Sequence, residues 1–518
     1  MKSRETIFTD IENLKIENES LRLKLNQNSG VLKNYEQQIN WLTEQLNSLK
    51  RGQFGSKSER WETEEQMLLL NEAELESRNP DDDQAEEDTV EVKGHKKKRG
   101  HRKALPEGLY REVIKLELPE AERVNEDGVL LKVIGWEISE KLKYEPSKMS
   151  VLQYHRAKYG VDSGDYVKTA PPVPSLIPKG IATPELLAAI ITAKYADGLP
   201  LYRMESIFGR QDVELSRGTM ARWVVRVAQA LEPIRNVLVE RFFECSYVAC
   251  DETKVQVLKE DGRKAETDSW MLVRSTPSAE KKIILFDYSV SRSSETMRNP
   301  FAGYAGTLQT DGLASYDCLE SENVDHVGCN MHARRRFEQA AKDGAKAGKS
   351  LGAVGMKFYK KIYDLEEELK GKTFEEKQRA RDEIAKPLFA ETKVWVELNR
   401  TKVPDKSKIG DAFRYFINQY ESLTGYLKSG ELNPDNGFTE RAIRKFAIGR
   451  NNWMFSDTPA GANASALLYS LVVTAKVNGV NIYRALTNIL TALPLAKTCD
   501  DYERLADLIL IPLPAAEK

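Results

Sequence analysis

Three acidic residues lie where a folded chain could bring their carboxylates together. Asp251 follows the apolar run 248–250, and Asp311 follows a second, shorter strand-like run. Glu440 opens a predicted helix just after the turn at 435–437. Ligands bind outside the carboxyl ends of strands in open α/β sheets, so the two aspartates are expected to project from strand ends and converge there. Glu440 would reach the same point from its helix.

Three carboxylates with few other ligands suit hard cations such as Mg²⁺ or Mn²⁺. Two such ions about 4 Å apart stabilise the attacking and leaving oxygens of an in-line phosphoryl displacement. The chain has 79 acidic residues, most of which must simply face solvent. A Glu at a helix start is also stabilised by the helix dipole alone. Three other acidic residues have comparable positions: Glu252, Asp287 and Asp435.

The elements that must position these carboxylates begin near residue 245, where the periodicity changes to that of strands. Three β-rich runs at 247–258, 269–276 and 281–289 precede a helix-compatible crossover. Two further strands follow, at 307–310 and 326–331, with a short helix between them. This succession is the one expected of a ribonuclease-H-like fold. We therefore expect an α/β catalytic domain at 241–480, interrupted by a charged helical insertion at about 338–430.

Residues 181–240 predict a helical DNA-binding region. Thr183 and Ser216 are candidate N-caps of two of its helices, with Pro184 at a first helical position. Arg217 and Arg222 are expected on the exposed side of the second, so that the two helices would form a helix-turn-helix. Helix pairs are common, and an ordinary packing role remains the alternative.

The N-terminal residues 1–50 predict a coiled coil, because apolar residues fill nearly all a and d positions of consecutive heptads. The coil would make the protein a homo-oligomer; the alternative is one long helix packed on its own chain. Residues 51–104 alternate acidic and basic blocks and predict a charged linker. Residues 105–180 predict a small β-rich module, and 481–518 a C-terminal helical tail.

The bulk composition is that of a globular chain of several domains. Its 518 residues include 41% hydrophobic and 30% charged residues, with a net charge of −2. Five scattered cysteines do not form a disulfide framework, and no apolar run of about twenty residues predicts a membrane span. We expect a cytoplasmic protein whose DNA contacts come from local basic patches.

A series of longer motifs runs through the chain in a fixed order. They are ENLKIENESLRLKL, FGSKSER, AKYADGLPLYR, ACDETKVQVL, LQTDGLASY, CNMHARRRF, DNGFTERAIR, GRNNWMFSDTPAGANAS and SLVVTAKVNG. In these motifs, and along nearly its whole length, the chain resembles the insertion-sequence-66 family of DDE transposases (the TnpC-type protein). The resemblance implies a bacterial, nucleoid-associated protein that acts on an element's terminal inverted repeats and on target DNA, alongside possible accessory proteins of the same element.

The resemblance also implies roles for individual residues. The family's acidic triad falls on Asp251, Asp311 and Glu440, with Tyr316 matching the tyrosine that follows the second aspartate. In that family the triad is implied to bind two divalent metals and to catalyse DNA cleavage and strand transfer. The resemblance thus implies a multidomain α+β transposase with a ribonuclease-H-like core.

A second set of residues is expected near DNA or the triad. Cys329 and His332 form a Cys-x-x-His pair, but no second such pair is nearby, which makes zinc unlikely there. His332 and its neighbours are better suited to DNA phosphate or to the carboxylates, and core packing explains Cys329 equally well. Ion pairing within the fold is the alternative for the arginines. The predicted DNA-contacting residues of this set are His332, Arg334, Arg335, Arg441, Arg444 and Arg450.

The chain departs from the family at two points. The family's small module carries paired Cys-x-x-Cys motifs at about 120–165, whereas this chain has no cysteine before Cys245. We therefore expect the module at 105–180 to be a degenerate zinc-finger-like fold without its metal. Gly437 replaces a common Asn, which leaves the three carboxylates intact. The alternative function is a catalytically silent, transposase-derived DNA-binding protein.

Overall fold

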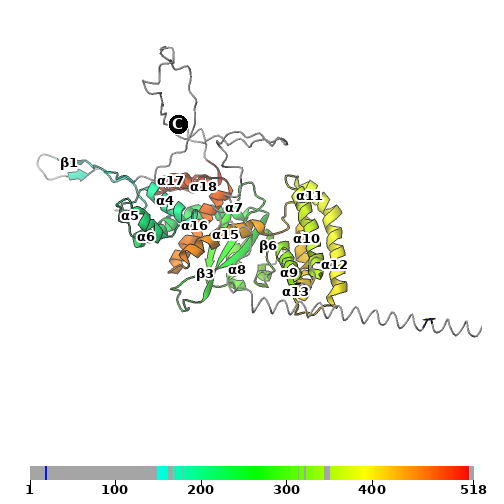
Figure 1. Ribbon diagram of the computed structural model, residues 1–518. Coiled ribbons are helices and arrows are strands. Elements are labelled where there is room, and N and C mark those ends of the chain that lie inside the picture. Colours follow the sequence, from blue (N-terminus) through cyan, green and yellow to red (C-terminus); the bar gives the residue numbers. More distant parts are fainter. Residues whose placement is uncertain are drawn as a thin grey trace, which may run out of the picture. The chain divides into compact units, whose positions relative to one another are not determined.

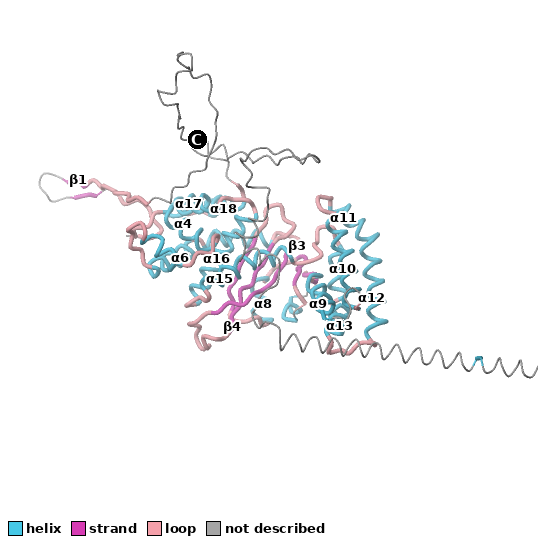
Figure 2. The backbone as a smooth tube through the Cα atoms, viewed as in Figure 1, coloured by secondary structure: helices cyan, strands magenta, loops and turns pink. Residues whose placement is uncertain are grey.

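The computed structural model describes residues 18–19, 149–160, 167–169, 171–178, 180–312, 314–319, 323–343 and 350–512. These residues form a mixed α+β structure with one large mixed sheet and many helices (Figure 2). The chain divides into two units, residues 1–54 with 155–514 and residues 55–154 with 515–518. All the elements below belong to the first unit.

Much of the predicted N-terminal organisation lies outside the described residues. Of the predicted coil only residues 18–19 are described, and they are helical. The predicted linker and residues 105–148 of the β-rich module are not described. The described end of that module contains one antiparallel pair of three-residue strands, 158–160 and 167–169.

The strands fall into two sheets, the small pair and a five-stranded sheet. They are β1 Lys158–Gly160, β2 Val167–Thr169, β3 Tyr247–Gln256, β4 Asp268–Ser275, β5 Ile284–Ser289, β6 Gly306–Thr310 and β7 Val324–Gly328. The larger sheet, whose strands β3 and β6 are labelled in Figure 1, has the order β5-β4-β3-β6-β7. Its β5-β4-β3 half is antiparallel, whereas β6 and β7 run parallel to β3. Strands occur at all five predicted segments.

The helices precede, interrupt and follow this sheet. The larger helices before the insertion are α4 Pro184–Tyr195, α5 Leu201–Gly209, α6 Arg217–Ala230, α7 Glu232–Phe243, α8 Ser294–Arg298 and α9 Asn330–Asp343. Those of the insertion are α10 Leu351–Glu368, α11 Phe374–Ala380, α12 Lys386–Arg400, α13 Lys408–Asn418 and α14 Tyr420–Thr424. The last are α15 Gly437–Trp453, α16 Pro459–Val477, α17 Ile482–Ala492 and α18 Cys499–Leu510.

Short helical turns complete the chain. They are η2 Asn299–Phe301, η3 Ala314–Leu319, η4 Arg381–Ala385, η5 Gly425–Lys428 and η6 Leu493–Leu495. The predicted caps are confirmed, because the Thr183 hydroxyl accepts the amide of Leu186 and the Ser216 hydroxyl accepts that of Thr219. Each cap satisfies one backbone donor that the first helical turn leaves without a partner.

Helix α16 closes the β5 edge of the sheet. The Thr474 hydroxyl accepts the Ile284 amide at 2.9 Å and donates to its carbonyl at 3.0 Å. The Ser470 hydroxyl accepts the amide of Phe286 at 2.8 Å. The four-residue step from Ser470 to Thr474 rises about 6 Å, which nearly matches two strand residues of about 6.6 Å, so the two hydroxyls meet alternate residues of β5. The helix thereby takes the place of a sixth strand.

Two hydrophobic clusters stabilise the unit. The larger joins α4–α7, the sheet and α15–α18, so that the predicted DNA-binding region, catalytic domain and C-terminal tail share one core. The smaller contains α9 and the insertion helices, with Phe337, Phe389 and Phe416 fully buried at its centre. Among the described helices only α16 is long and apolar enough to cross a membrane, and 72% of its apolar window is buried inside the protein.

Candidate functional site

Asp251 lies in the middle of β3, and the prediction that it closes the strand was wrong. Its Cα pairs with Val273 of β4, and that pairing continues to Gln256 and Asp268. The parallel neighbour β6, in contrast, pairs with β3 only as far as Ala249. At Asp251 the strand therefore has a partner on one edge and an open edge on the other.

Asp311 follows β6 at this open edge. The last pair of the parallel register joins Ala249 to Gln309, and Asp251 and Asp311 each lie two residues beyond this pair. Neighbouring strands lie about 4.8 Å apart, and residues in register point to the same face of a sheet. The next residue, Gly312, approaches the insertion so closely that an added Cβ would lie 2.8 Å from the Tyr415 hydroxyl. Helix α13 thus packs directly against the turn that carries Asp311.

Glu440 lies in the first turn of α15, whose start is tied to the sheet. Asn436 is 1% exposed, and its side-chain amide donates to the Cys250 carbonyl of β3 at 2.8 Å. The Asn436 backbone amide donates to the Cys329 sulfur at 3.3 Å. One residue before Glu440, the Thr439 hydroxyl lies 2.8 Å from that of Ser275. These contacts direct the start of the helix toward the face of β3 that carries Asp251.

The three carboxylates share one electrostatic environment. Burial raises the pKa of Asp251 well above its ordinary value, and the charge of Glu252 raises it further. The charges of Asp311 and Glu440 act in the same direction, which places both near Asp251. A hydrogen bond from the Glu252 amide partly offsets these effects. A donor set made of carboxylate oxygens fits a hard divalent cation such as Mg²⁺ or Mn²⁺.

Helix α9 adds a histidine and an arginine to the same place. Arg335 pairs with Glu440 at 3.1 Å, and it is 48% exposed. Burial lowers the pKa of His332, whereas the charges of Glu440 and Asp311 raise it. The His332 Nδ1 atom is buried without a hydrogen-bond partner. Arg334, the residue before Arg335, pairs with Glu338 of its own helix at 3.8 Å.

Cys329 lies beside His332 and Glu440, and ligand atoms of the three residues lie within 4.8 Å of one another. Burial, together with the charge of Asp435, raises the pKa of the Cys329 thiol. A structural zinc site normally takes four such ligands, and among the described residues this group has three. The sulfur instead accepts the Asn436 amide and fixes the turn before α15.

The three other acidic candidates have structural partners. Asp287 pairs with Arg235 and, at 2.8 Å, with the buried Arg274. Asp435 accepts the Gly437 amide at 2.8 Å within its own turn. Glu252 is almost fully buried beside the site, where it accepts a hydrogen bond from the Tyr316 hydroxyl and lies 3.8 Å from Arg292.

The predicted DNA-contacting arginines lie on two helices besides α9. Arg217 and Arg222 are exposed on α6, and the Arg222 guanidinium donates to the Thr219 hydroxyl of its own helix. Arg441 and Arg444 are exposed on α15. Arg450 differs, because its guanidinium donates to the backbone carbonyl of Lys254. It therefore ties α15 to β3 in addition to any role toward DNA.

A buried polar network, which the sequence did not predict, links β3 and β6 to the segment before α15. The Tyr247 hydroxyl donates to the Gln309 side chain, whose amide donates to the Asn433 carbonyl at 2.9 Å. The Asn330 side chain bonds the carbonyls of Leu423 and Pro434. The available signal was Gln309, an amide beside Leu308 in the strand-like run that forms β6. Such residues are buried only when their polar atoms have partners.

Comparison with known families defines first the class of protein. Residues 179–464 match the family described as "Transposase IS66 family", so the protein is a transposase and its partner is DNA. Residues 41–114 match a second family, described as "Transposase C of IS166 homeodomain". The first match covers more than half of the chain, and the chain belongs to the IS66 transposase family. The resemblance found in the sequence motifs is confirmed.

Three similar proteins come from Sinorhizobium fredii (strain NBRC 101917 / NGR234). The uncharacterized protein y4qI is 31% identical over 92% of this chain and 90% of its own length. The uncharacterized protein y4hP is 26% identical over 86% of this chain and 84% of its own length. The uncharacterized protein y4jD is 28% identical over 79% of this chain and 82% of its own length. Their descriptions name no activity, so the chemistry must be argued from the site.

Proposed function

We propose that this transposase cleaves and joins DNA by metal-dependent phosphoryl transfer at a site formed by Asp251, Asp311 and Glu440. The observation that supports the proposal is the register of β3 and β6, because Asp251 and Asp311 each lie two residues beyond the last parallel pair, Ala249 and Gln309. The strand order, with three antiparallel strands followed by two parallel ones, supports a ribonuclease-H-like catalytic core.

Two successive displacements account for the reaction. In the first, a water oxygen attacks phosphorus at the element end, the P–O3′ bond breaks, and the departing 3′ oxygen gains a proton as the water loses one. In the second, that 3′-hydroxyl attacks phosphorus in the target, forming a new P–O3′ bond while the target's own P–O3′ bond breaks. The target's 3′ oxygen takes up the proton.

The carboxylates of Asp251, Asp311 and Glu440 would hold two divalent cations. When bound, these cations would stabilise the charge on the attacking and leaving oxygens. Arg335 pairs with Glu440 and is half exposed, so it can turn to a DNA phosphate once Glu440 binds a cation. His332 and Arg334 would contact the same backbone, and Arg441 and Arg444 would extend that contact along α15.

The remaining predictions complete the proposed organisation. The coil at 1–50 would pair protomers, so that two element ends are held in one complex. The linker at 51–104 and the degenerate module at 105–180 would connect the coil to the helical region. Arg217 and Arg222 of α6 would then contact DNA in a helix-turn-helix arrangement at 181–240, beside the catalytic domain at 241–480.

Cleavage and strand-transfer assays on the element's own terminal repeats, with Mg²⁺ or Mn²⁺, test this proposal. Asp251→Asn, Asp311→Asn and Glu440→Gln should each retain DNA binding and lose both reactions. The matched control is Asp325→Asn. Asp325 is an exposed carboxylate of the same sheet that lies away from the site and pairs with Lys428 at a distance of 2.8 Å. Retained joining in any one of the three variants would remove that residue from the site.

A silent DNA-binding protein is the alternative, suggested by the missing N-terminal cysteines. It predicts binding to terminal repeats without cleavage under any metal. The presence of all three carboxylates favours the active enzyme, since a silent relative gains nothing from buried charges that repel one another. Cleavage without joining would instead indicate a nuclease with the same metal site.

A further inference from the structure

The two segments that carry Asp251 and Asp311 are joined by a side-chain hydrogen bond. β3 and β6 stop pairing two residues before these aspartates. Beyond that point the Tyr316 hydroxyl donates a hydrogen bond to the Glu252 carboxylate. Glu252 follows Asp251 directly, and Tyr316 lies in η3, five residues after Asp311. A side-chain contact therefore takes over where the backbone pairing ends.

Both partners of this hydrogen bond are enclosed by the protein. Tyr316 is fully buried, and the side chain of Glu252 is 5% exposed. The Cys250 sulfur lies 3.7 Å from the same hydroxyl and, being two residues from Glu252, belongs to the same face of β3. A buried polar group that loses its partner cannot exchange it for water, so the bond is costly to break. It fixes η3 against β3.

Arg292 holds the other oxygen of the Glu252 carboxylate. Its guanidinium lies 3.8 Å from that oxygen and 4.4 Å from the centroid of the Trp270 ring. Stacking on an aromatic face suits the flat guanidinium and fixes its orientation. Burial raises the pKa of Glu252, and the charge of Asp311 raises it further, which places Asp311 close to this carboxylate.

The position of Glu252 suits it to support the site rather than to bind its metal. Successive residues of a strand point to opposite faces, so Glu252 and Asp251 lie on opposite faces of β3. The two oxygens of Glu252 face Tyr316 and Arg292. A ligand of the catalytic metals would have to face Asp251 instead.

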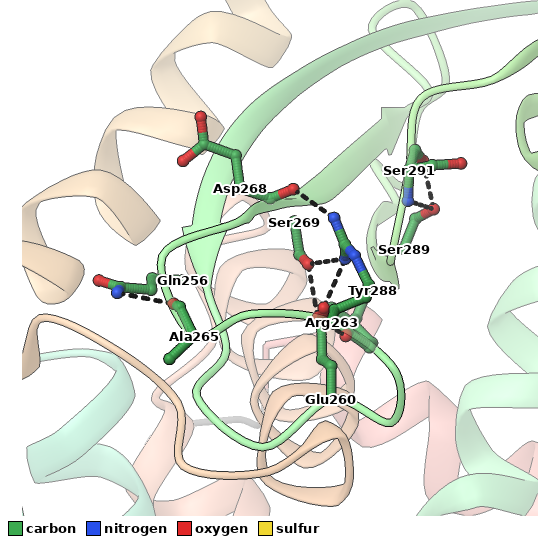
Figure 3. A network of polar contacts seen from close by, with 9 residues as sticks. All are labelled: Gln256, Glu260, Arg263, Ala265, Asp268, Ser269, Tyr288, Ser289 and Ser291. Atoms are coloured by element: carbon green, nitrogen blue, oxygen red, sulfur yellow. Dashed lines mark hydrogen bonds and ion pairs between the residues drawn. The ribbon is translucent and has the colours of Figure 1, made fainter.

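A second hydrogen bond between a tyrosine and a buried glutamate occurs in the same sheet (Figure 3). The Tyr288 hydroxyl donates to the Glu260 carboxylate, which is 7% exposed, accepts a hydrogen bond from Ser269 and pairs with Arg263. Figure 3 shows these side chains converging between the hairpin loop and the strands. Tyr288 belongs to β5, which β4 separates from β3. This bond therefore stabilises the hairpin and joins no segment that carries a triad residue.

We propose that Tyr316 and Glu252 are positioning residues, whose hydrogen bond sets the separation of Asp251 and Asp311 where the strands no longer pair. The inference rests on the proposed function, because it concerns the same metal site. Loss of a residue that orients metal ligands typically costs about 10–100-fold in metal affinity or activity. A misplacement of about 1 Å is enough for an effect of this size on the reaction.

Strand transfer and Mn²⁺ binding by the full chain, each measured beside the melting temperature, test the inference. Tyr316→Phe keeps the ring and removes the donor. It should lower the kcat of strand transfer and the affinity for Mn²⁺ about tenfold each, and change the KM for DNA less than about twofold. Tyr288→Phe is the matched control, because it removes the equivalent hydrogen bond from the hairpin. It should lower the melting temperature and leave kcat and Mn²⁺ affinity within about twofold of wild type.

Two replacements of Glu252 separate positioning from metal binding. Glu252→Gln keeps an oxygen that accepts the Tyr316 hydroxyl, and it should retain Mn²⁺ affinity within about threefold of wild type. Glu252→Ala should lose about as much kcat and Mn²⁺ affinity as Tyr316→Phe does. The double variant should lose no more than either single variant, because both changes remove the same bond.

Three outcomes would contradict this account. Wild-type kcat and Mn²⁺ affinity in Tyr316→Phe would overturn the inference and leave the proposed function intact. Loss of Mn²⁺ binding in Glu252→Gln as complete as in Asp251→Asn would also overturn it, since Glu252 would then be a metal ligand. Wild type that neither binds Mn²⁺ nor joins DNA would overturn the proposed function as well.

Discussion

Two places in the same sheet lack a neighbouring strand, and the protein treats them in opposite ways. At β5, the hydroxyls of Ser470 and Thr474 satisfy the free backbone groups of the edge. At β3, the loss of its β6 neighbour beyond Ala249 leaves room for carboxylates, and burial together with the charges of neighbouring carboxylates raises the pKa values of Asp251 and Glu252. A satisfied edge stabilises the fold, whereas a group of carboxylates that repel one another is what a bound cation would stabilise. Four predictions test this contrast.

Replacing Asp251 should separate activity from stability most strongly. Asp251→Asn should reduce strand transfer by at least about 10²–10³-fold, in the range found when one transition-state contact is removed. In EDTA the same variant should melt at a higher temperature than wild type, because a buried charge that faces other carboxylates has been removed. A lower melting temperature in EDTA would show that Asp251 stabilises the fold rather than the reaction.

Removing Asp287 should have the opposite effect on stability. Asp287→Ala leaves Arg274, whose side chain is 3% exposed, buried without its carboxylate, and should cost about 3–5 kcal/mol of unfolding free energy. The control is Asp268→Ala, where both partners of the ion pair with Lys254 are at least half exposed, and a change below about 1 kcal/mol is expected. Denaturant unfolding measures both. Equal effects would contradict the assignment of Asp287 to the fold.

Removing a hydroxyl of α16 that bonds the β5 edge should lower the unfolding free energy by less than Asp287→Ala does. Thr474→Val keeps the side-chain shape but leaves the Ile284 amide and carbonyl unpaired, and should destabilise the protein by about 1–3 kcal/mol. Joining activity per folded molecule should not change. Thr491→Val is the matched control, since Thr491 is exposed and its hydroxyl donates to the Thr487 carbonyl of its own helix. If Thr474→Val folded fully but lost strand-transfer activity, the β5 edge could not be separate in function from the site at β3.

A pH effect should be the smallest. The raised pKa of Asp251 means that the metal-free folded state binds its proton more tightly than the unfolded chain does. This contribution to stability is complete below the ordinary Asp pKa and is lost as pH rises through the raised value. As pH rises, the unfolding free energy of wild type should therefore fall relative to that of Asp251→Asn. The slope for one proton is at most about 1.4 kcal/mol per pH unit. Parallel pH profiles for the two proteins would refute the raised pKa.

Local signals in the sequence predicted local structure well. Thr183 and Ser216 act as caps where their residue types and the following helical periodicity predict them. The strand segments were recognisable because apolar runs between turn residues have few other uses. The family itself was recognisable from motifs such as DNGFTERAIR.

Features that depend on distant partners were not predictable. The polar run after Cys250 indicates a strand end, but β4 continues the pairing to Gln256, and that partner is invisible in the strand's own sequence. The two hydrogen bonds that α16 makes to β5 join residues far apart in the sequence. Phe286 and Ser470 are separated by 184 positions, and Ile284 and Thr474 by 190 positions. Cys329 and Asn436 likewise meet only because the insertion returns the chain to the sheet.

Binding of Mn²⁺ to the metal-free protein tests the central claim most directly, because it needs neither the DNA sequence nor accessory proteins. Electron paramagnetic resonance titration should show bound Mn²⁺ in wild type and in Asp325→Asn. It should show clearly weakened binding in Asp251→Asn, Asp311→Asn and Glu440→Gln alike. Unchanged Mn²⁺ binding in all three variants would contradict the proposal that these carboxylates form one metal site.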